Sequence, residues 1–413
     1  MAPASITHNR ERCDPCTLSV VKMPNVNPFD KPTIQSRLSV RGTKWHRDAP
    51  DIIPLWLADP DYPLCPELKD EMRKVIEEEY TVYGSDLEAR RAISEKLKRV
   101  NKLEIPKEQV MMSQGVTPTM WLAIQNACRP GDEVIVTDPM YFPFFTAVGV
   151  TNTRPVYWKL DLEEGYKFDI ERLKACITPK TKLIFVCNPH NPAGRAMTKE
   201  ELKGIAEVAV DNKLYIMVDE LWEDIRYDGH KHYSLAALDD EAAAQTMTSW
   251  GFSKTWSVPG FQAGYMGCTN KVMFDGLQKL ATGVLRGTNN LIKGIAPLIC
   301  SGKIDYWVKD MNKYLAEVRD LVAKRLTGMG DITVPRLDAT YLMFPRFNYG
   351  ISSNELEKVL LNDAKVSLHN GTAFGPSGDG HMRILTATSK GIMNEALDRI
   401  EGVIPKLEKM KKK

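Results

Sequence analysis

Three side chains of different chemistry each follow a short apolar run of the kind that forms a buried strand. They are the amide of Asn191, the carboxylate of Asp219 and the amine of Lys254, and the runs before them are 183–187, 214–218 and 247–250. In an open α/β sheet, ligands bind at the carboxyl ends of the parallel strands. We therefore expect the three side chains to meet at one edge of a sheet.

Together these groups suit an aldehyde cofactor that carries a pyridine ring. The amine of Lys254 can form an imine with the aldehyde, and the carboxylate of Asp219 can keep a pyridinium nitrogen protonated, which makes the ring an electron sink. The amide of Asn191 can donate to a phenolic oxygen on the ring. Alone, each group has an ordinary structural explanation, as a helix cap, a surface lysine or a turn. Their joint occurrence predicts pyridoxal 5′-phosphate (PLP).

A phosphate site is predicted at Gly115, Val116 and Thr117, between an expected strand and an expected helix. Backbone N–H groups at a helix N-terminus attract an anion, and the Thr117 hydroxyl adds a donor. The structural alternative is an ordinary helix cap. Ser253, which precedes Lys254, offers a further hydroxyl.

Arg383 is the residue that we expect to bind a substrate carboxylate. A guanidinium can form two parallel hydrogen bonds with a carboxylate, which would hold the Cα–H bond of an amino acid against the cofactor ring. Arg383 lies in the strand-like run 382–385, shortly after the turn-forming segment 371–376. The structural alternative is an arginine on a strand surface.

The order of periodic segments predicts the scaffold that positions these residues. Helices are expected over 66–79, 86–100, 117–127, 200–211, 306–326 and 353–361 and at the C-terminus, and strands over 109–112, 133–136, 183–187, 214–218, 247–250, 332–334, 340–344, 366–368 and 382–385. Thr198, with Glu201 three residues later, is a capping signal for the helix over 200–211. The alternation of strands and helices predicts an α/β protein with an open, largely parallel sheet covered by helices.

The length of 413 residues favours two domains and an arm. Residues 1–50 are polar and punctuated by proline, and they are expected to form the arm. Residues 51–300 should form a large cofactor-binding domain. Residues 301–413 should form a smaller α+β domain, joined by part of the N-terminal segment.

Composition excludes several classes of protein. The net charge of +2 argues against nucleic-acid binding. The absence of a bilayer-length apolar stretch and of a signal peptide favours the cytoplasm. Most of the eight cysteines lie in apolar contexts and are expected to be reduced. Cys13 and Cys16 lack a second pair at zinc spacing, and no metal site is expected.

Over roughly residues 40–405 the chain resembles the fold-type I PLP enzymes of the class I/II aminotransferase family, on the segments 188–194, 219–220, 253–254, 371–376 and 382–384. The resemblance implies that Lys254 binds the cofactor and moves the substrate's α-proton. It implies that Asp219 pairs with the pyridine nitrogen and that Asn191 contacts the phenolic oxygen. Tyr141 aligns with the aromatic residue that stacks on the ring, with a core aromatic as the alternative.

The resemblance also implies a homodimer, because the family takes a phosphate-binding tyrosine from the partner subunit. Tyr80 fits that register, with Tyr83 as the rival, and Thr288 is a further residue that could reach across. The full cofactor set is then Lys254, Asp219, Asn191, Tyr141, Val116, Thr117, Ser253, Tyr80, Trp222 and Gln262, and the substrate set is Arg383, Asn191 and Ala58.

Three positions depart from the pattern typical of the family. Trp222 replaces a tyrosine, Gln262 replaces a phosphate-binding arginine, and Gly251 replaces a phosphate-binding serine. The segments 41–45 and 54–59 are similar to those of the related cystathionine-type C–S β-lyases, whereas 383–389 is similar to aminotransferases.

These features predict transamination between an L-amino acid and a 2-oxo acid. The alternative enzyme activity is β-elimination from cystathionine or another cysteine conjugate. A ligand-sensing regulator would need an added DNA-binding domain. The first 50 residues are too short for one and lack the pattern of a helix-turn-helix motif. The amino-acid donor stays open: Arg286 would suit a distal carboxylate, while Trp56, Tyr62, Tyr141 and Trp222 would suit an aromatic or apolar side chain.

Overall fold

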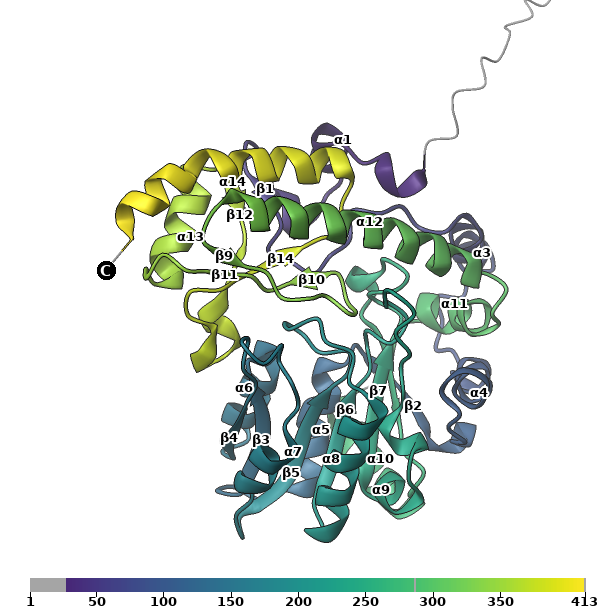
Figure 1. The fold of residues 1–413 in the computed structure, drawn as a ribbon. Helices are drawn as coiled ribbons and strands as arrows, with labels where there is room; N and C mark the ends of the chain where they lie inside the picture. The colour runs from purple at the N-terminus through teal and green to yellow at the C-terminus, as the bar shows by residue number, and fades with distance from the viewer. Residues whose placement is uncertain (1–26, 286, 412–413) are drawn as a thin grey trace, which may run out of the picture.

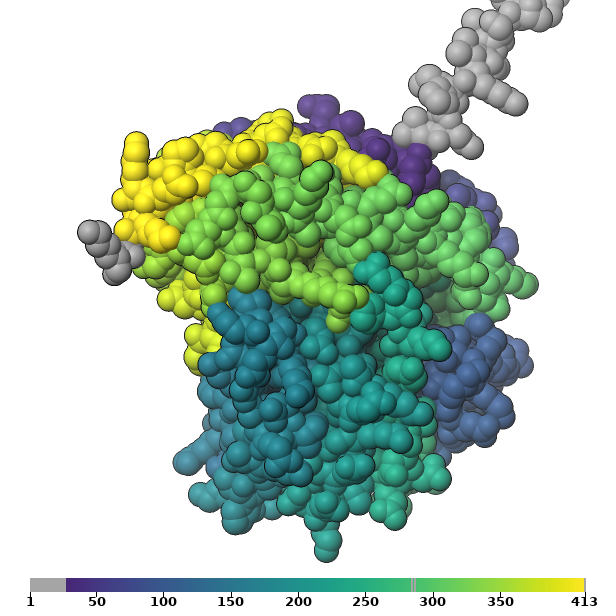
Figure 2. Space-filling model, in the orientation of Figure 1, coloured from purple at the N-terminus to yellow at the C-terminus, as the bar shows by residue number. Residues whose placement is uncertain are grey.

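The computed structural model describes residues 27–285 and 287–411. Two lobes are visible in Figure 1: the lower one holds a large sheet, and the upper one combines the purple N-terminal segment with the green and yellow C-terminal segments. The lobes press against each other in the space-filling view of Figure 2. Cys13, Cys16 and Arg286 lie outside the described residues.

The large lobe is built on a seven-stranded sheet with the order β2-β8-β7-β6-β5-β3-β4. Its strands are β2 (Val110–Gln114), β3 (Glu133–Asp138), β4 (Arg154–Lys159), β5 (Thr181–Cys187), β6 (Tyr215–Asp219), β7 (Thr246–Gly251) and β8 (Ala263–Gly267). β8 runs antiparallel to both of its neighbours, and the other pairings are parallel. The prediction of a largely parallel sheet is therefore confirmed.

Helices cover both faces of this sheet, which explains why its central strands read as unbroken apolar runs. Along β5, Leu183 and Phe185 pack with α5 (Thr117–Ala127), α6 (Phe142–Val150) and α10 (Lys271–Val284). Ile184 and Val186, which point to the opposite face, pack with α7 (Ile170–Ala175) and α8 (Lys199–Asp211). Period-2 alternation thus buries the strand on both faces from Leu183 to Cys187.

The predicted capping signal is present at the start of α8. The Thr198 hydroxyl accepts from the Glu201 backbone N–H at 3.1 Å, and the Glu201 carboxylate accepts from the Thr198 N–H at 2.8 Å. Two N–H groups that the helix leaves without internal partners are thereby satisfied.

The small lobe combines segments from both halves of the chain. Its helices are α12 (Asp305–Met329), α13 (Ser353–Asn362) and α14 (Lys390–Met410), and its short strands are β9 (Ile332–Thr333), β10 (Leu342–Met343), β11 (Arg346–Phe347), β12 (Val366–Ser367), β13 (His369–Asn370) and β14 (Met382–Leu385). β1 (Ile53–Pro54) pairs in parallel with β12, so the N-terminal segment belongs to this lobe. Within the described part of the chain, no helix is both long and apolar enough to span a bilayer.

The N-terminal segment is pinned to the small lobe through Asp61. The Asp61 carboxylate lies 2.9 Å from the Lys44 amine and 3.2 Å from the Arg37 guanidinium, and it accepts from the Trp45 indole N–H at 2.8 Å. From residue 27 onward, the expected polar arm is thus helical in part (α1, Ile34–Leu38; α2, Thr43–His46) and well anchored. α3 (Pro66–Glu77), α4 (Leu87–Lys96) and α11 (Asn290–Cys300) then pack together beside the sheet.

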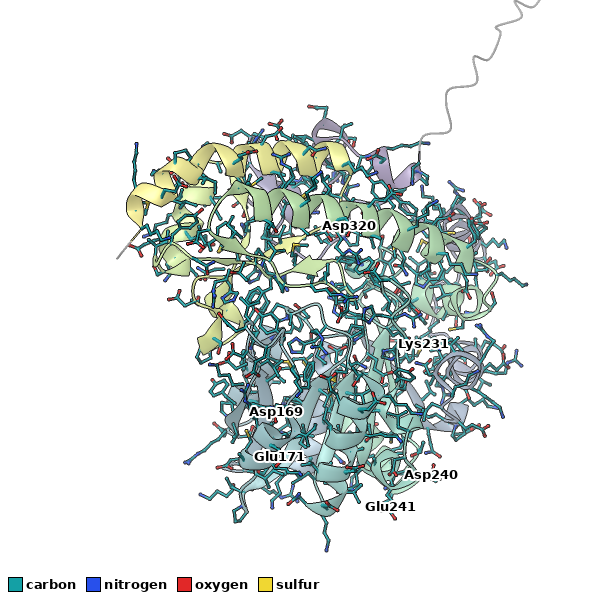
Figure 3. All side chains as sticks on the ribbon, in the orientation of Figure 1. Asp169, Glu171, Lys231, Asp240, Glu241 and Asp320 are labelled. Carbon is teal, nitrogen blue, oxygen red and sulfur yellow. The ribbon has the colours of Figure 1, made fainter. Side chains whose placement is uncertain are left out.

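Acidic side chains lie at the N-termini of two helices of the large lobe, far from the small lobe. Figure 3 labels Asp169 and Glu171 at α7, and Asp240 and Glu241 at α9 (Asp240–Gln245), well away from the junction of the lobes. Asp169 accepts from two backbone N–H groups of α7 at 2.9 and 3.1 Å. Carboxylates in these positions stabilise helix N-termini.

Candidate active site

Three neighbouring parallel strands bring the predicted residues to one edge of the sheet. β5, β6 and β7 lie side by side in the sheet. Asn191 follows β5, Asp219 is the last residue of β6, and Lys254 lies just after β7. All three side chains therefore lie at the junction with the small lobe, where the carboxyl ends of the strands meet.

A cleft of about 380 Å³ opens at this edge. It is lined by Gln114, Gly115, Val116, Thr117, Pro118, Tyr141, Asp219, Leu221, Ser253, Lys254, Pro259 and Gln262. Seven of the residues predicted to hold the cofactor are among them: Lys254, Asp219, Tyr141, Val116, Thr117, Ser253 and Gln262. Lys254 is the single basic residue of this lining, so the cleft is poor in positive charge.

The Lys254 amine is buried and bonds to the other lobe. It donates to the Ala58 backbone carbonyl at 2.7 Å and lies 5.7 Å from the centre of the Trp222 ring. Burial lowers the pKa of Lys254 to about 8, with the nearby Arg383 acting in the same direction and the Asp59 and Asp219 carboxylates opposing it. The neutral form of this amine, which can accept a proton, is therefore a minor species at pH 7 but far more abundant than for an ordinary lysine.

Asp59 was not singled out from the sequence, yet it faces the Lys254 amine. It follows Ala58, and among the charged groups around Lys254 it has the largest effect on the pKa of that amine. The Asp59 carboxylate has no hydrogen bond or ion pair with any described residue. The neighbouring Asp61, in contrast, is fully engaged by the N-terminal segment.

Asp219 is buried where a cation would stabilise its charge. One carboxylate oxygen accepts from the Leu221 N–H at 2.9 Å, and the residue is 2 % exposed. Burial raises the pKa of Asp219 to about 7, although the bond from Leu221 acts in the opposite direction. A protonated pyridine nitrogen beside this carboxylate would supply the missing positive charge.

Glu220, on the other side of β6, anchors the end of the strand. Its carboxylate accepts from the Ser234 hydroxyl at 2.6 Å and from the Trp250 indole N–H at 2.7 Å, and it lies 3.1 Å from a ring nitrogen of His232. Nearby, Glu223 is ion-paired with the buried Lys96. The sequence gives no local signal for this buried cluster, because its members come from four separated segments.

Arg383 crosses from the small lobe to the large one. Its guanidinium donates to the Asn191 side-chain oxygen at 3.2 Å and to the Trp56 carbonyl at 3.1 Å, and it lies 4.7 Å above the Phe374 ring. The Arg383 Nε has no partner among the described residues. Burial lowers the pKa of Arg383 to about 10, which leaves the group charged at neutral pH. This fork is positioned to bind a carboxylate.

Tyr141 lies between the two charged ends of the site. It precedes α6 and lines the cleft. Burial raises the pKa of Tyr141, and the nearest charged side chains that influence it are Arg383 and Asp219. Its ring therefore lies where a planar cofactor between Asp219 and Arg383 could contact it.

The predicted anion site has the geometry of a helix start. Val116 is the residue before α5, Thr117 is the first residue of the helix, and Gly115 has a φ of 82°, which favours glycine. No side-chain bond caps this helix. Pro118 carries no N–H and the Thr119 N–H donates to the Val116 carbonyl at 3.0 Å, so the backbone donors left for a ligand are those of Val116 and Thr117. The Ser253 hydroxyl lies 3.4 Å from the Ala263 carbonyl, beside the same cleft.

Gly251 leaves no space for the serine that is common at this position in the family. An added Cβ would lie 2.7 Å from the Ala263 carbonyl oxygen and 2.7 Å from a methyl carbon of Leu221. Gly251 is also absent from the lining of the cleft. Trp222, the second departure, packs edge-on against Tyr341 with ring centres 4.7 Å apart. Gln262, the third, lines the cleft without a charge.

The residues predicted to reach a partner subunit lie outside the cleft of their own chain. The Tyr80 hydroxyl donates to the Ser85 carbonyl at 2.8 Å, whereas the Tyr83 side chain is fully exposed. Thr288 is buried, and its hydroxyl has no partner within the described ranges.

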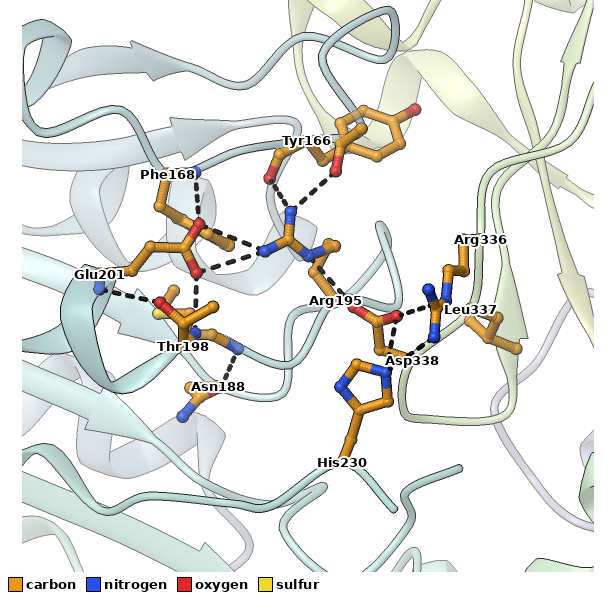
Figure 4. Close-up of polar contacts among 12 residues, drawn as sticks. Tyr166, Phe168, Asn188, Arg195, Thr198, Glu201, His230, Arg336, Leu337 and Asp338 are labelled. Carbon is orange, nitrogen blue, oxygen red and sulfur yellow. Dashed lines mark hydrogen bonds and ion pairs between the residues drawn. The ribbon is translucent and has the colours of Figure 1, made fainter. Parts of the chain in front are cut away.

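Arg195 fastens the loop after β5 to both lobes (Figure 4). Its guanidinium lies 3.2 Å from the Glu201 carboxylate on α8 and 3.2 Å from Asp338 of the small lobe. Asn188, in the same loop, accepts from the Met197 N–H at 3.0 Å. These contacts hold the loop that carries Asn191 in one conformation.

Several known sequences are similar to this chain over most of its length. The family model for aminotransferase class I and II matches residues 50–400. The aromatic-amino-acid aminotransferase 2 of Thermococcus litoralis is 31% identical over 86% of this chain and 92% of its own length. A cystathionine beta-lyase of Bacillus subtilis is 27% identical over 91% of this chain and 99% of its own length.

Two solved structures share the fold. The aromatic aminotransferase of Pyrococcus horikoshii OT3 superposes with a TM-score of 0.83 at 28% identity and covers 92% of this chain and 100% of its own. Cystalysin of Treponema denticola, whose crystal structure contains PLP, superposes with a TM-score of 0.85 at 24% identity and covers 91% of this chain and 98% of its own.

Proposed function

Because the chain belongs to the aminotransferase class I and II family, we propose that it is a PLP-dependent enzyme that transfers an amino group between an L-amino acid and a 2-oxo acid. One arrangement carries this proposal. The Lys254 amine and the Asp219 carboxylate line one cleft at the junction of the lobes, and the Arg383 guanidinium lies near enough to Lys254 to affect the pKa of its amine.

The described residues fit PLP. Lys254 would hold its aldehyde, Asp219 its pyridine nitrogen and Asn191 its phenolic oxygen, with Tyr141 against the ring. The start of α5 at Val116 and Thr117, with Ser253 and Gln262, would hold the phosphate. The raised pKa of the buried Asp219 supports this fit, because a pyridinium would provide the cation that the carboxylate lacks.

When bound, PLP supplies an electron sink that stabilises negative charge at the substrate's α-carbon. Arg383 binds the α-carboxylate and, with the Asn191 side chain and the segment at Ala58, orients the Cα–H bond. Lys254 then accepts the α-proton from the substrate and delivers it to a carbon atom at the opposite end of the conjugated system. A pKa of about 8 suits this exchange near neutral pH.

β-Elimination from cystathionine or another cysteine conjugate is the second candidate. The lyase of Bacillus subtilis aligns over 99% of its own length and 91% of this chain. Both reactions begin with removal of the same α-proton by Lys254. They differ in whether a β-substituent leaves as a thiol.

A single experiment separates the two reactions. The PLP-loaded enzyme is mixed with aspartate, aromatic amino acids, alanine or L-cystathionine, with no 2-oxo acid acceptor. An aminotransferase releases about one 2-oxo acid per site and stops, because nothing takes up the amino group. A lyase forms pyruvate, ammonia and homocysteine continuously from cystathionine and water. Turnover that persists in Lys254→Ala would contradict both mechanisms.

We also propose that the enzyme is a cytoplasmic homodimer. The six cysteines of the described residues are all unpaired, as expected in a reducing compartment. Ile76, Val82, Tyr83 and Leu87 are exposed apolar side chains around the link between α3 and α4, close to Tyr80. Such a patch suits a subunit interface, and sedimentation equilibrium tests it.

The division into domains belongs to the same proposal. We place the cofactor-binding domain at 51–300 and the small domain at 301–413 with part of the N-terminal segment. The single large sheet within residues 110–267 and the pairing of β1 with β12 support this division. Limited proteolysis, with mapping of the stable fragments, tests the boundary near residue 300.

A further inference from the structure

A second cavity lies at the junction of the lobes and shares no lining residue with the active-site cleft. It is open to solvent and has a volume of about 380 Å³. The large lobe contributes Lys159, Leu160, Asp161, Leu162, Glu163 and Tyr166, and the small lobe contributes Arg346, Ser377 and His381. Any ligand held here would contact both lobes at once.

Two buried side chains of this lining carry polar atoms without partners. Tyr166 is 2 % exposed and His381 is 5 % exposed. The Tyr166 hydroxyl and the His381 Nε2 have no hydrogen-bond partner among the residues that the structure describes. A buried polar group without a partner costs about 1–3 kcal/mol, so two of them beside one cavity call for an explanation.

The backbone of Tyr166 is held in an uncommon conformation. Its φ is 55°, in the left-handed region that non-glycine residues seldom adopt. Arg195 donates to the Gly165 carbonyl at 2.9 Å and to the Tyr166 carbonyl at 3.4 Å (Figure 4). The loop is thus fixed by its backbone, while the Tyr166 hydroxyl is bound to nothing in the described structure.

The two atoms offer opposite hydrogen-bonding roles. His381 Nδ1 lies 3.1 Å from the Asp379 carbonyl, which can only accept, so Nδ1 carries the proton and Nε2 is an acceptor. Burial lowers the pKa of His381 to about 4, which keeps the ring neutral. Burial also raises the pKa of Tyr166, so its hydroxyl stays a donor.

Charged side chains of both signs surround these atoms. The Arg346 guanidinium lies 2.6 Å from the Glu163 carboxylate, and the Lys159 amine lies 3.5 Å from the Asp161 carboxylate. The four charges sum to zero. A small molecule that matches this lining carries a hydrogen-bond donor for His381 and an acceptor for Tyr166. Its own charges are of both signs, like those of the lining.

We propose that this cavity binds a free α-amino acid as its zwitterion, at a site separate from the active site. The ammonium group donates to His381 Nε2, and the carboxylate accepts from the Tyr166 hydroxyl. The inference rests on the proposed function for one point: the enzyme's own substrate or product belongs to this class of ligand.

A chain of aromatic side chains in contact links the cavity to Arg383, the residue proposed to bind substrate. The His381 ring stacks on Phe344 at 4.7 Å, and Phe344 meets the edge of Phe374 at 5.5 Å. Phe374 in turn lies 4.7 Å below the Arg383 guanidinium. The cavity is therefore connected to the packing behind Arg383 by direct side-chain contacts.

Ser377 supplies a second link between the cavity and the large lobe. Its hydroxyl donates to the Asp138 carboxylate at 2.7 Å, at the end of β3 and three residues before Tyr141. A ligand that bridges the lobes beside this bond stabilises their contact.

The test is equilibrium dialysis of the PLP-loaded full chain with ¹⁴C-labelled 2-aminoisobutyrate. This zwitterion has no α-hydrogen, so proton abstraction cannot consume it. We expect two equivalents per chain at saturation for the wild type and one for Arg383→Ala. In the Arg383→Ala background, Tyr166→Phe and His381→Phe should each weaken the remaining binding by about fivefold to tenfold, the value of one hydrogen bond.

Tyr349→Phe in the same background is the matched control, because the Tyr349 hydroxyl is also buried without a described partner but does not line the cavity. It should leave binding unchanged. Isobutyrate and isopropylamine, which carry one charge each, should not compete. One equivalent for the wild type and none for Arg383→Ala would overturn the proposal, as would equal binding by all three aromatic variants. Dialysis reports binding alone, so a failure of the proposed catalytic function would appear instead as absent turnover with the second equivalent intact.

Discussion

The Lys254 amine donates a 2.7 Å hydrogen bond to the backbone carbonyl of Ala58. This bond joins the loop after β7 to the N-terminal segment, which pairs with the small lobe through β1. The next carboxylate along that segment, Asp59, is also the charged group with the greatest effect on the pKa of Lys254. The reactive amine therefore has its charge balanced from the opposite lobe.

Asp59→Asn should shift the pH dependence of turnover. A neutral Lys254 is the base, so activity rises as pH increases through its pKa of about 8. The Asp59 carboxylate holds that pKa up; its removal lowers the pKa and moves the rising limb to lower pH. Profiles of kcat/KM against pH for the variant and the wild type measure the shift. Asp240→Asn, at the far end of the large lobe, is the control (Figure 3), and coincident limbs for Asp59→Asn would refute the assignment.

Arg383→Ala should weaken substrate binding. The lost guanidinium contributes charge-assisted hydrogen bonds to the α-carboxylate, so we expect kcat/KM to fall roughly a hundredfold, mainly through KM. Steady-state kinetics with an amino acid and its matched amine, which lacks the carboxylate, provide the measurement. The amine should react alike with both proteins. Arg325→Ala, on the exposed face of α12, should leave both constants unchanged.

Asp219 should make the cofactor-free protein lose stability as pH rises from about 4 to about 7. Its folded-state pKa of about 7 lies above the usual value near 3.9, so the folded chain binds more protons in this interval and the free energy of unfolding falls with pH by a few kcal/mol. Urea unfolding at several pH values measures the slope. Asp219→Asn should lack this part of the slope; identical slopes in the two proteins would show that the carboxyl group is not held protonated by burial.

Gly251→Ser should destabilise the protein without improving its affinity for PLP. The new Cβ would lie 2.7 Å from a backbone oxygen and 2.7 Å from Leu221, and overpacking of this kind costs about 1–3 kcal/mol. The urea midpoint and the dissociation constant for PLP report the two effects. Gly149→Ser, where a Cβ meets nothing within 4 Å, is the matched control. Tighter PLP binding by Gly251→Ser would show that the strand shifts to admit a phosphate ligand.

Segments with strong local signals were predictable from the sequence. α5 begins and ends as predicted, at Thr117 and Ala127, and α8 follows its Thr198–Glu201 capping signal. The run Leu183–Cys187 forms β5 because both of its faces are covered. The order of motifs at strand ends was sufficient to predict that Asn191, Asp219 and Lys254 lie at one edge of the sheet.

Other parts of the fold depend on partners distant in sequence. β8 is rich in glycine, and it is a strand because β2 and β7 flank it; Gly264 is required where an added Cβ would lie 2.5 Å from the Gly115 backbone. The roles of Asp59 and of the Glu220 cluster also arise from tertiary contacts. Nothing local distinguishes Asp59 from Asp61, although Arg37, Lys44 and Trp45 engage only the carboxylate of Asp61.

The pairing of β1 with β12 has a consequence for how the chain is synthesised. The Ser389 hydroxyl bonds to the Pro32 carbonyl, 357 residues earlier in the chain, and Ile53 pairs with Val366. On the ribosome, the first half of the small lobe emerges long before the second half exists. The seven strands of the large sheet, which all lie between them, can assemble during that interval. The small lobe can therefore close only after β12 has been synthesised, and a chain stalled before β12 has no Arg383 for its active site.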